Sequence, residues 1–184
     1  VMDALTWPHL LSLVVDELPA VQEQALGTLR NLVYGSQQDV LTTIRGCGGM
    51  DAFFALLEAR LVSSNARCQE QILYILCNAT SSAMQSVEVK DALIARGSLL
   101  TPLLACLQHS LAQVKVAALW CIINLAWSGS PGAGVRQQEL LKHNLVSTLE
   151  GLLTDVDLDV KDRSKSTLEQ FTSCGSILPT KMEL

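Results

Sequence analysis

The chain has 184 residues, of which 49% are hydrophobic and only 17% are charged, and its formal net charge is −5. A chain this apolar has ample surface to bury, so intrinsic disorder is excluded. No apolar run approaches the roughly 18 residues that would span a bilayer. Nucleic acid and anionic membranes both require a positive surface, so the acidic balance predicts that neither is a partner.

The six cysteines form no CxxC pair, and most lie inside apolar helical patterns. We interpret them as buried thiols of a protein from a reducing compartment, so we expect a cytoplasmic and nuclear location. The N-terminus has no basic segment followed by an apolar stretch, as a secretory signal would. The sequence begins inside a structured pattern, and we therefore expect that it was cut from a longer chain.

Four segments of the chain repeat at a nearly constant step of 47, 46 and 46 residues. The segments are VQEQALGTLRNLV from Val21, CQEQILYILCNAT from Cys68, VKVAALWCIINLAW from Val114 and VKDRSKSTLEQF from Val160. A polar residue near the end of each segment keeps the same step, namely Asn31, Asn78, Asn124 and Gln170. Steps of about 40–47 residues are typical of the helical HEAT and armadillo repeats.

Each segment predicts one long amphipathic helix. In the first segment, Ala25, Leu26 and Leu29 share one broad face, and Gln24 and Asn31 lie opposite. Shorter apolar stretches between the segments predict two further helices in each unit. The first helix of a unit ends in a residue that accepts the left-handed conformation, at Gly46, Gly97 and Asn144. Such triplets bury their apolar faces only by stacking on one another.

The sequence therefore predicts an all-α, right-handed armadillo-repeat solenoid (an ARM/HEAT superhelix) of about four units, of which the first is incomplete. We expect repeats over residues 1–171, with approximate units at 8–34, 38–81, 89–127 and 135–171. Residues 172–184 are predicted to form a C-terminal tail. The Gly- and Ser-rich segment 128–134 is predicted to be an exposed loop.

Three segments carry a resemblance to a known family. ALGTLRNL from Ala25, EQILYILCN from Glu70 and VKVAALWCIINLAW from Val114 resemble the third helices of armadillo repeats. From about Leu10 to Phe171, the order of the segments is similar to the C-terminal repeats of the armadillo scaffold subunits of GID/CTLH ubiquitin ligases. This resemblance implies a non-catalytic scaffold whose partners are protein subunits of such a ligase, above all its substrate receptor.

In an armadillo stack the long helices line a concave groove, where Asn amides can bond the backbone of an extended peptide of any sequence. Alternatively, the same amides bond neighbouring backbone and only stabilise the solenoid. Tyr74 and Trp120 each lie four residues before an Asn, where a ring forms a slot for a docked side chain; packing on an adjacent repeat is the alternative. The predicted groove residues are Gln24, Asn31, Gln71, Tyr74, Asn78, Trp120, Asn124, Trp127 and Gln170.

No catalytic motif is found in the sequence. Asp155, Asp157 and Asp159 alternate as in a calcium loop, but Val160 and Ser166 stand where that loop needs Gly and Glu. We expect these carboxylates at a helix N-terminus, where the helix dipole favours negative charge. The sequence thus predicts no enzyme, no metal site, no cofactor and no small-molecule substrate.

Two other binding roles stay open. An importin-α-like adaptor would grip basic nuclear-localisation peptides through an array of Trp residues, each four positions before an Asn. Only one of the four positions is Trp here, because they read Gly27, Tyr74, Trp120 and Ser166. A junction-associated structural protein would use a basic groove, whereas the predicted groove of this chain is close to neutral.

Overall fold

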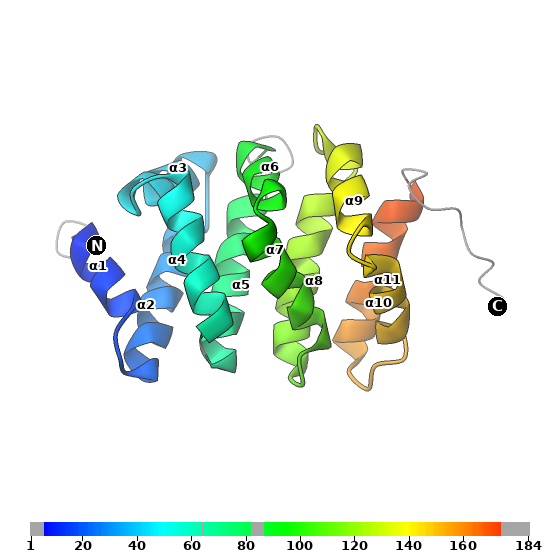
Figure 1. The fold of residues 1–184 in the computed structure, drawn as a ribbon, viewed down its shortest axis with the longest axis horizontal. Coiled ribbons are helices and arrows are strands. Elements are labelled where there is room, and N and C mark those ends of the chain that lie inside the picture. The colour runs from blue at the N-terminus through cyan, green and yellow to red at the C-terminus, as the bar shows by residue number, and fades with distance from the viewer. Residues whose placement is uncertain (1–5, 64, 82–86, 174–184) are drawn as a thin grey trace.

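The computed structural model describes residues 6–63, 65–81 and 87–173, and within these ranges it contains helices and turns but no strand. Figure 1 shows the helices standing in successive groups along the long axis of the molecule. The prediction of an all-α chain is confirmed for the described residues. Residues 174–184, most of the predicted tail, lie outside them, and the predicted unit bounds stay predictions.

After an initial pair, the helices recur in groups of three. The pair is α1 (Trp7–Val14) and α2 (Pro19–Leu32). The next group is α3 (Gln37–Gly46), α4 (Met50–Ser63) and α5 (Ala66–Thr80). The third is α6 (Val87–Ala95), α7 (Gly97–Ala105), which continues into the 3₁₀ turn Cys106–Gln108, and α8 (Ala112–Ala126). The fourth is α9 (Ala133–Leu141), α10 (Leu145–Leu152) and α11 (Leu158–Ser173). Four units with an incomplete first one are therefore observed in the described chain.

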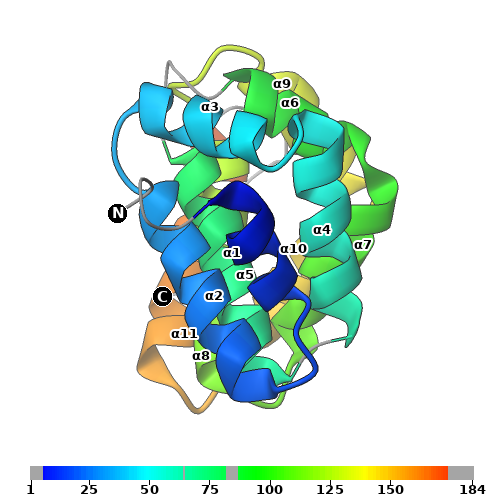
Figure 2. The ribbon, with the colours of Figure 1, turned by 90° about the vertical axis from the view of Figure 1, so that its left-hand side faces the viewer.

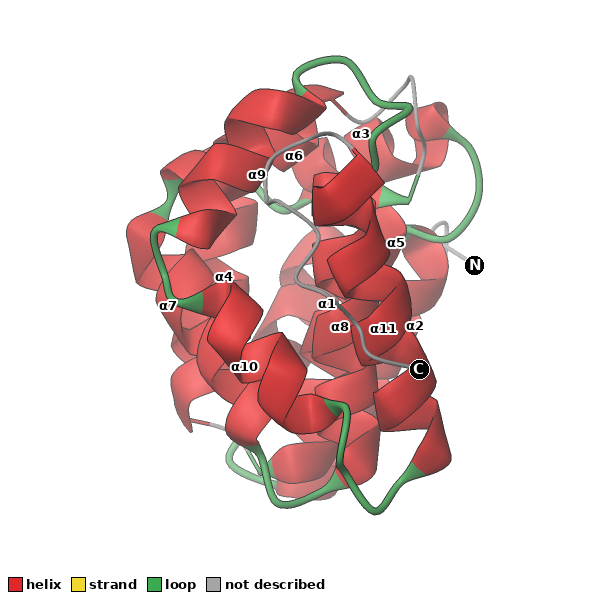
Figure 3. Cartoon of the chain, turned by 90° about the vertical axis from the view of Figure 1, so that its right-hand side faces the viewer, coloured by secondary structure: helices red, strands yellow, loops and turns green. Residues whose placement is uncertain are grey.

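The last helix of each unit, which we call the third helix, packs against the third helix of the next unit. The helices α2, α5, α8 and α11 thus form one layer. A second layer contains α4, α7 and α10, and α3, α6 and α9 lie across one end of both layers (Figures 1 and 2). The view from the opposite end separates α10 from α11 and α8 in the same way (Figure 3).

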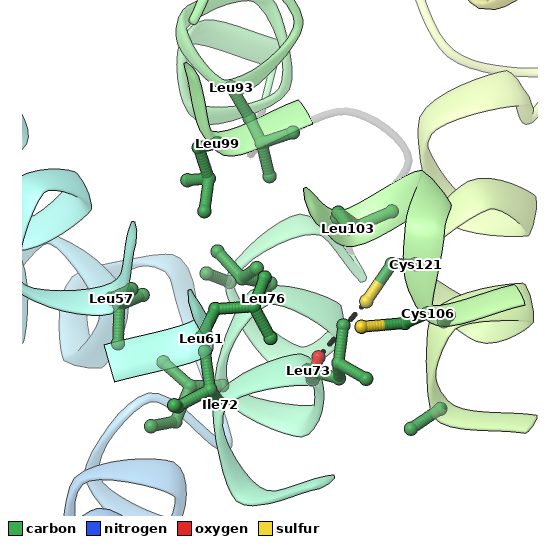
Figure 4. Packing of buried hydrophobic residues seen from close by; sticks show 14 of the residues in the cluster. Leu57, Leu61, Ile72, Leu73, Leu76, Leu93, Leu99, Leu103, Cys106 and Cys121 are labelled. Carbon is green, nitrogen blue, oxygen red and sulfur yellow. Dashed lines mark hydrogen bonds between the residues drawn. The ribbon is translucent and has the colours of Figure 1, made fainter. Parts of the chain in front are cut away.

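The core runs between the layers. Figure 4 shows side chains of α4, α5 and α7 meeting there, among them Leu61, Leu76 and Leu103. The predicted buried face of α2 is confirmed, because Ala25, Leu26 and Leu29 are all buried. Four of the five described cysteines are buried as predicted, namely Cys47, Cys68, Cys106 and Cys121. Burial of these apolar side chains is the main driving force that holds neighbouring units together.

Two of the three predicted left-handed helix ends are wrong. Asn144 does adopt a φ of 55° in the turn before α10. Gly97, however, is the first residue of α7. Beyond α3 the left-handed residues are Gly48 and Gly49, with φ of 95° and 103°, rather than Gly46. The chain thus continues α3 to Gly46 before it turns.

Gly46 is needed for packing rather than for backbone conformation. A Cβ atom at this position would lie 2.1 Å from a carbon of the Trp7 ring. Two carbon atoms that are not bonded to each other do not approach this closely. The glycine on α3 therefore allows the Trp7 ring of α1 to pack there. The close approach ties the incomplete first unit to the second one.

A buried polar cluster holds the loop between α8 and α9. The guanidinium of Arg136 donates to the carbonyl oxygen of Leu125 at 2.9 Å and pairs with Asp91 of α6 at 2.7 Å. Both Arg136 (3.1 Å) and Lys90 (3.3 Å) donate to the hydroxyl oxygen of Ser130. Burial and the neighbouring Arg136 charge lower the pKa of Lys90 to about 8. The loop is therefore anchored through Ser130, although most of its other residues are exposed as predicted.

None of the described helices alone is long and apolar enough to cross a membrane. The helices α3 and α4 meet the length and composition only when taken together, across a bend of 79°. Within the fold, the apolar side chains Phe53, Phe54 and Leu57 of α4 are buried in the core.

Candidate functional site

The predicted groove residues lie on the third helices or directly after one. Gln24 and Asn31 belong to α2; Gln71, Tyr74 and Asn78 to α5; Trp120 and Asn124 to α8, with Trp127 at its end; and Gln170 to α11. None of these nine side chains is fully buried. We call the outward surface that they define the third-helix face.

A hollow of about 320 Å³ lies between α2 and α5 on this face. It is lined by Arg30, Asn31, Tyr34, Tyr74 and Asn78. The fold therefore brings together three of the predicted residues, which come from two successive units. We refer to these five residues as the α2–α5 hollow.

Sequence reasoning missed two residues of the α2–α5 hollow, Arg30 and Tyr34. Tyr34 is 75% exposed and follows Asn31 by three residues. Trp127 follows Asn124 by the same interval, so this spacing could have identified Tyr34. Arg30 offers no comparable signal, because the equivalent positions in the next two units are Cys77 and Ile123.

Two of the Asn side chains bond the preceding third helix. The amide of Asn78 donates to the carbonyl oxygen of Arg30 at 3.2 Å, and that of Asn124 donates to the carbonyl oxygen of Cys77 at 3.0 Å. Both carbonyls belong to the last turn of their helix, where no backbone N–H of the helix is available to them; the Cys77 carbonyl also accepts from the Thr80 hydroxyl at 3.2 Å. The alternative weighed from the sequence, stabilisation of the solenoid, thus holds for these donors.

The side-chain oxygens of the same amides, and that of Asn31, accept no hydrogen bond from the part of the chain that the structure describes. Asn31 is itself exposed, and no third helix precedes α2 in the described chain. An Asn side chain offers two donors and an acceptor, so each of the three retains capacity for another backbone.

Trp120 is half-buried, and a cationic side chain of the next unit stacks on its ring. The guanidinium carbon of Arg163, on α11, lies 4.1 Å from the centre of a Trp120 ring. The Nε atom of Arg163 also lies 3.1 Å from a carboxylate oxygen of Asp159; this is an ion pair without hydrogen-bond geometry, because the buried Nε atom has no hydrogen-bond partner among the described residues. This ring is therefore already engaged by the chain itself.

Trp127 and Gln170 lie at the far end of the third-helix face. The indole of Trp127 is 44% exposed, and its Nε1 would lie 2.6 Å from a Cβ atom at Gly129. The side-chain oxygen of Gln170 accepts from the backbone N–H of Ser128 at 3.4 Å. The amide of Gln137 donates to the Gln170 carbonyl oxygen at 3.1 Å. Gln170 thus serves to join α11 to the loop after α8.

The two remaining predicted residues do not line the α2–α5 hollow. Gln24 is exposed on α2. The side-chain oxygen of Gln71 is buried without a hydrogen bond and lies 3.8 Å from the position of a Cβ atom on Gly27. Gln71 therefore points at the preceding helix rather than into the hollow.

The Tyr74 hydroxyl at the α2–α5 hollow and the nearby Cys77 thiol both have raised pKa values, so both stay neutral at physiological pH. Burial is the main cause that raises the pKa of Tyr74, and the carboxylates of Glu70 and Asp159 raise it further. Burial likewise raises the pKa of the Cys77 thiol to about 11. A thiol must ionise to act as a nucleophile, so Cys77 is not poised for catalysis.

The aspartates before α11 behave as the sequence predicts. The Asp157 side chain accepts from the backbone N–H groups of Asp159 and Val160 at 3.0 and 3.1 Å and so caps the helix. Asp155 pairs with Lys115 of α8. In the part of the chain that the structure describes, no group of three His, Cys, Asp or Glu side chains could hold a metal ion.

These triplets of helices, stacked through their third helices, are also found in solved structures. A designed armadillo repeat protein in complex with the peptide (KR)4 matches with a TM-score of 0.75 and 23% identity, covering 91% of this chain and 64% of that chain. Computationally designed armadillo repeat proteins for modular peptide recognition match with a TM-score of 0.77 and 21% identity, covering 92% and 66%. The fold is an armadillo-repeat solenoid, as predicted.

Among curated proteins, the chain is similar to Armadillo repeat-containing protein 8. The protein from Xenopus laevis is 28% identical over 172 residues, which cover 93% of this chain and 23% of that protein. The protein from Mus musculus is 27% identical over the same length and is covered to 24%. The chain thus spans about a quarter of the length of these relatives, and no protein-family model matches it. The predicted resemblance to armadillo-repeat proteins is confirmed.

Proposed function

We propose that this chain is a non-catalytic scaffold that docks an extended segment of a partner protein on its third-helix face, at the α2–α5 hollow. The observation that carries the proposal is the meeting of Asn31, Tyr74 and Asn78 in one hollow. Amides one repeat apart and an aromatic wall are what a peptide backbone and its side chains need.

The hydrogen-bonding capacity of the amides defines how such a segment binds. The side-chain oxygens of Asn31 and Asn78 accept from peptide N–H groups, and the free amide of Asn31 donates to a peptide carbonyl. The rings of Tyr34 and Tyr74 provide apolar walls for one side chain of the segment. Because backbone groups make these bonds, the docked sequence is selected mainly by what fits between the rings.

The similarity to Armadillo repeat-containing protein 8 supports a finer proposal. As the sequence resemblance implies, the partners are the substrate receptor and the scaffold subunits of a GID/CTLH-type ubiquitin ligase, in the cytoplasm and nucleus. The importin-α-like alternative is less well supported, because the Trp120 ring already carries Arg163 and no Trp array is present.

Capture of the isolated substrate-receptor subunit by immobilised chain tests the proposal. The joint variant Asn31→Ala, Tyr34→Ala and Tyr74→Ala should reduce capture at least about tenfold, since such losses are typical where central aromatic contacts are removed. Asn31 and Tyr34 are exposed, so their replacement should change thermal unfolding little, whereas Tyr74 packs against the core and its truncation should lower the unfolding midpoint.

The matched control removes exposed amides away from the third-helix face, through Gln38→Ala on α3 and Gln138→Ala on α9. Its capture should equal that of the wild type. Unchanged capture by the hollow variant, which cooperative thermal unfolding must show to be folded, would contradict docking at this hollow.

A further inference from the structure

Side chains of successive third helices meet in a fixed register. Seven residues before each Asn or Gln of the repeat stand Gln24, Gln71, Ala117 and Arg163. Four residues before stand Gly27, Tyr74, Trp120 and Ser166. In two cases the first kind of residue lies against the second kind on the preceding helix: Gln71 approaches Gly27, and Arg163 covers Trp120.

Arg163 is held over Trp120 by two contacts. Its guanidinium lies 4.1 Å from the ring centre, a distance at which the cation is attracted to the aromatic face. Its Nε atom lies 3.1 Å from a carboxylate oxygen of Asp159 one turn earlier, which attracts it by charge without a hydrogen bond. The side chain is only 33% exposed. The cation therefore occupies the place over the ring that a docked cationic side chain would need.

The equivalent place over Tyr74 is different. By the register, its neighbour on α8 is Ala117, whose side chain is one methyl group and is fully buried. On the side of α2, Tyr74 lines the α2–α5 hollow. One aromatic position of the third-helix face is open, and the other is filled from within.

We infer that Arg163 is a specificity-determining residue, which fills the slot over Trp120 and excludes cationic side chains of a docked segment from the α8–α11 end of the third-helix face. The inference rests on the proposed function only in that this face is the docking surface. A ligand cation has to displace Arg163 from both ring and carboxylate, and it meets a like charge as it approaches. Neutral and acidic side chains meet no such repulsion.

The test uses a fluorescent octapeptide of alternating Lys and Arg and measures its anisotropy with the whole chain. The Arg163→Ala variant should bind this peptide about five- to thirtyfold more tightly than the wild type, the range expected for a new contact between a cation and an aromatic ring. Arg163→Gln keeps the length of the side chain without its charge and should show the same direction of change.

Lys165→Ala is the matched control, because this exposed lysine lies on the same helix and its removal changes the net charge equally. It should change affinity by less than about twofold. The Trp120→Ala change in the Arg163→Ala background should remove the gain. In the indole region of ¹H–¹⁵N spectra, the Trp120 signal, assigned by its loss in Trp120→Phe, should shift on peptide addition only after Arg163 is replaced.

Equal gains for Arg163→Ala and Lys165→Ala would overturn the inference, because they would reflect net charge alone. So would an unchanged affinity of both Arg163 variants, provided that far-ultraviolet circular dichroism shows them folded. Failure of the substrate receptor to bind the α2–α5 hollow would count against the proposed function. It would leave the peptide result at Trp120 to be decided separately.

Discussion

The two ends of the third-helix face contain equivalent residues in different states. Between α2 and α5, Asn31 and Tyr34 are exposed and line a hollow with residues of the next helix. Between α8 and α11, Arg163 covers Trp120, and Gln170 bonds the loop after α8. The repeat thus sets where a side chain lies on the third-helix face. The residue that the next third helix contributes then decides whether that side chain is exposed or covered.

The ion pairs between units show the same contrast. At the α2–α5 end, Arg67 and Glu23 are 3.9 Å apart, with side chains 79% and 27% exposed. At the α8–α11 end, Lys115 and Asp155 form a close pair whose side chains are only 13% and 10% exposed. The ion pair at the α8–α11 end is therefore shielded from solvent, whereas the pair at the α2–α5 end is loose and largely exposed.

The largest expected loss of stability comes from truncating a core side chain of α8, the helix that joins the two ends of the third-helix face. Leu119 is fully buried in α8, which packs between α5 and α11. Leu119→Ala should lower the free energy of unfolding by about 2–5 kcal/mol, as other buried Leu truncations do. Urea denaturation measures this loss. For comparison, Leu111→Ala, at a residue 47% exposed, should stay within about 0.5 kcal/mol. Equal midpoints for the two variants would mean that the buried face of α8 is misassigned.

The next largest loss of stability is expected on breaking the shielded ion pair, and it can be compared with the loss on breaking the exposed pair. Lys115→Met should cost about 1–3 kcal/mol, because it leaves the shielded Asp155 carboxylate without its cation. Arg67→Met breaks an exposed pair and should cost no more than about 0.5 kcal/mol. Urea denaturation of both variants at neutral pH gives the difference, and similar losses would show that the α8–α11 end is no more firmly tied than the other.

Acid should remove the contribution of the shielded pair. The hydrogen bond from Lys115, and next the backbone N–H of Asp157, hold the pKa of Asp155 below the usual 3.8. A carboxyl group with a lowered pKa stabilises the folded chain above its unfolded-state pKa, and the stabilisation is lost as pH falls through the folded-state value. The stability difference between the wild type and Lys115→Met should therefore persist from pH 7 to 5 and close below pH 3.8. A gap that stays constant into this acidic range would contradict the assignment.

The repeat made most of the fold predictable from the sequence. A step of 46–47 residues, with an Asn or Gln at one position, was enough to find four stacked helices and the faces that they bury. Contacts between different positions of the repeat could not be predicted, because the sequence gives the period of the repeat but not which position of one helix lies against which position of the next. Arg163 contacts Trp120, although the two residues stand at different positions of their repeats. Position 46 must be glycine because the Trp7 ring leaves no room for a Cβ atom there. The hollow likewise depends on Arg30, which has no counterpart in the next two units.

The smallest expected loss of stability concerns the Asn side chains, which either hold neighbouring helices together or remain exposed for a ligand. Asn124→Ala removes one of the two donors to the last-turn carbonyl of Cys77, the other being the Thr80 hydroxyl, and should cost about 1 kcal/mol, close to the mean for one intramolecular hydrogen bond. The exposed Asn31 makes no such bond to another described residue, so Asn31→Ala should stay within about 0.5 kcal/mol. Capture of the substrate receptor should show the reverse order, with the larger loss for Asn31→Ala, because only that residue lines the α2–α5 hollow. If both variants lost the same stability and the same capture, the amides would not divide between holding the solenoid and holding a ligand.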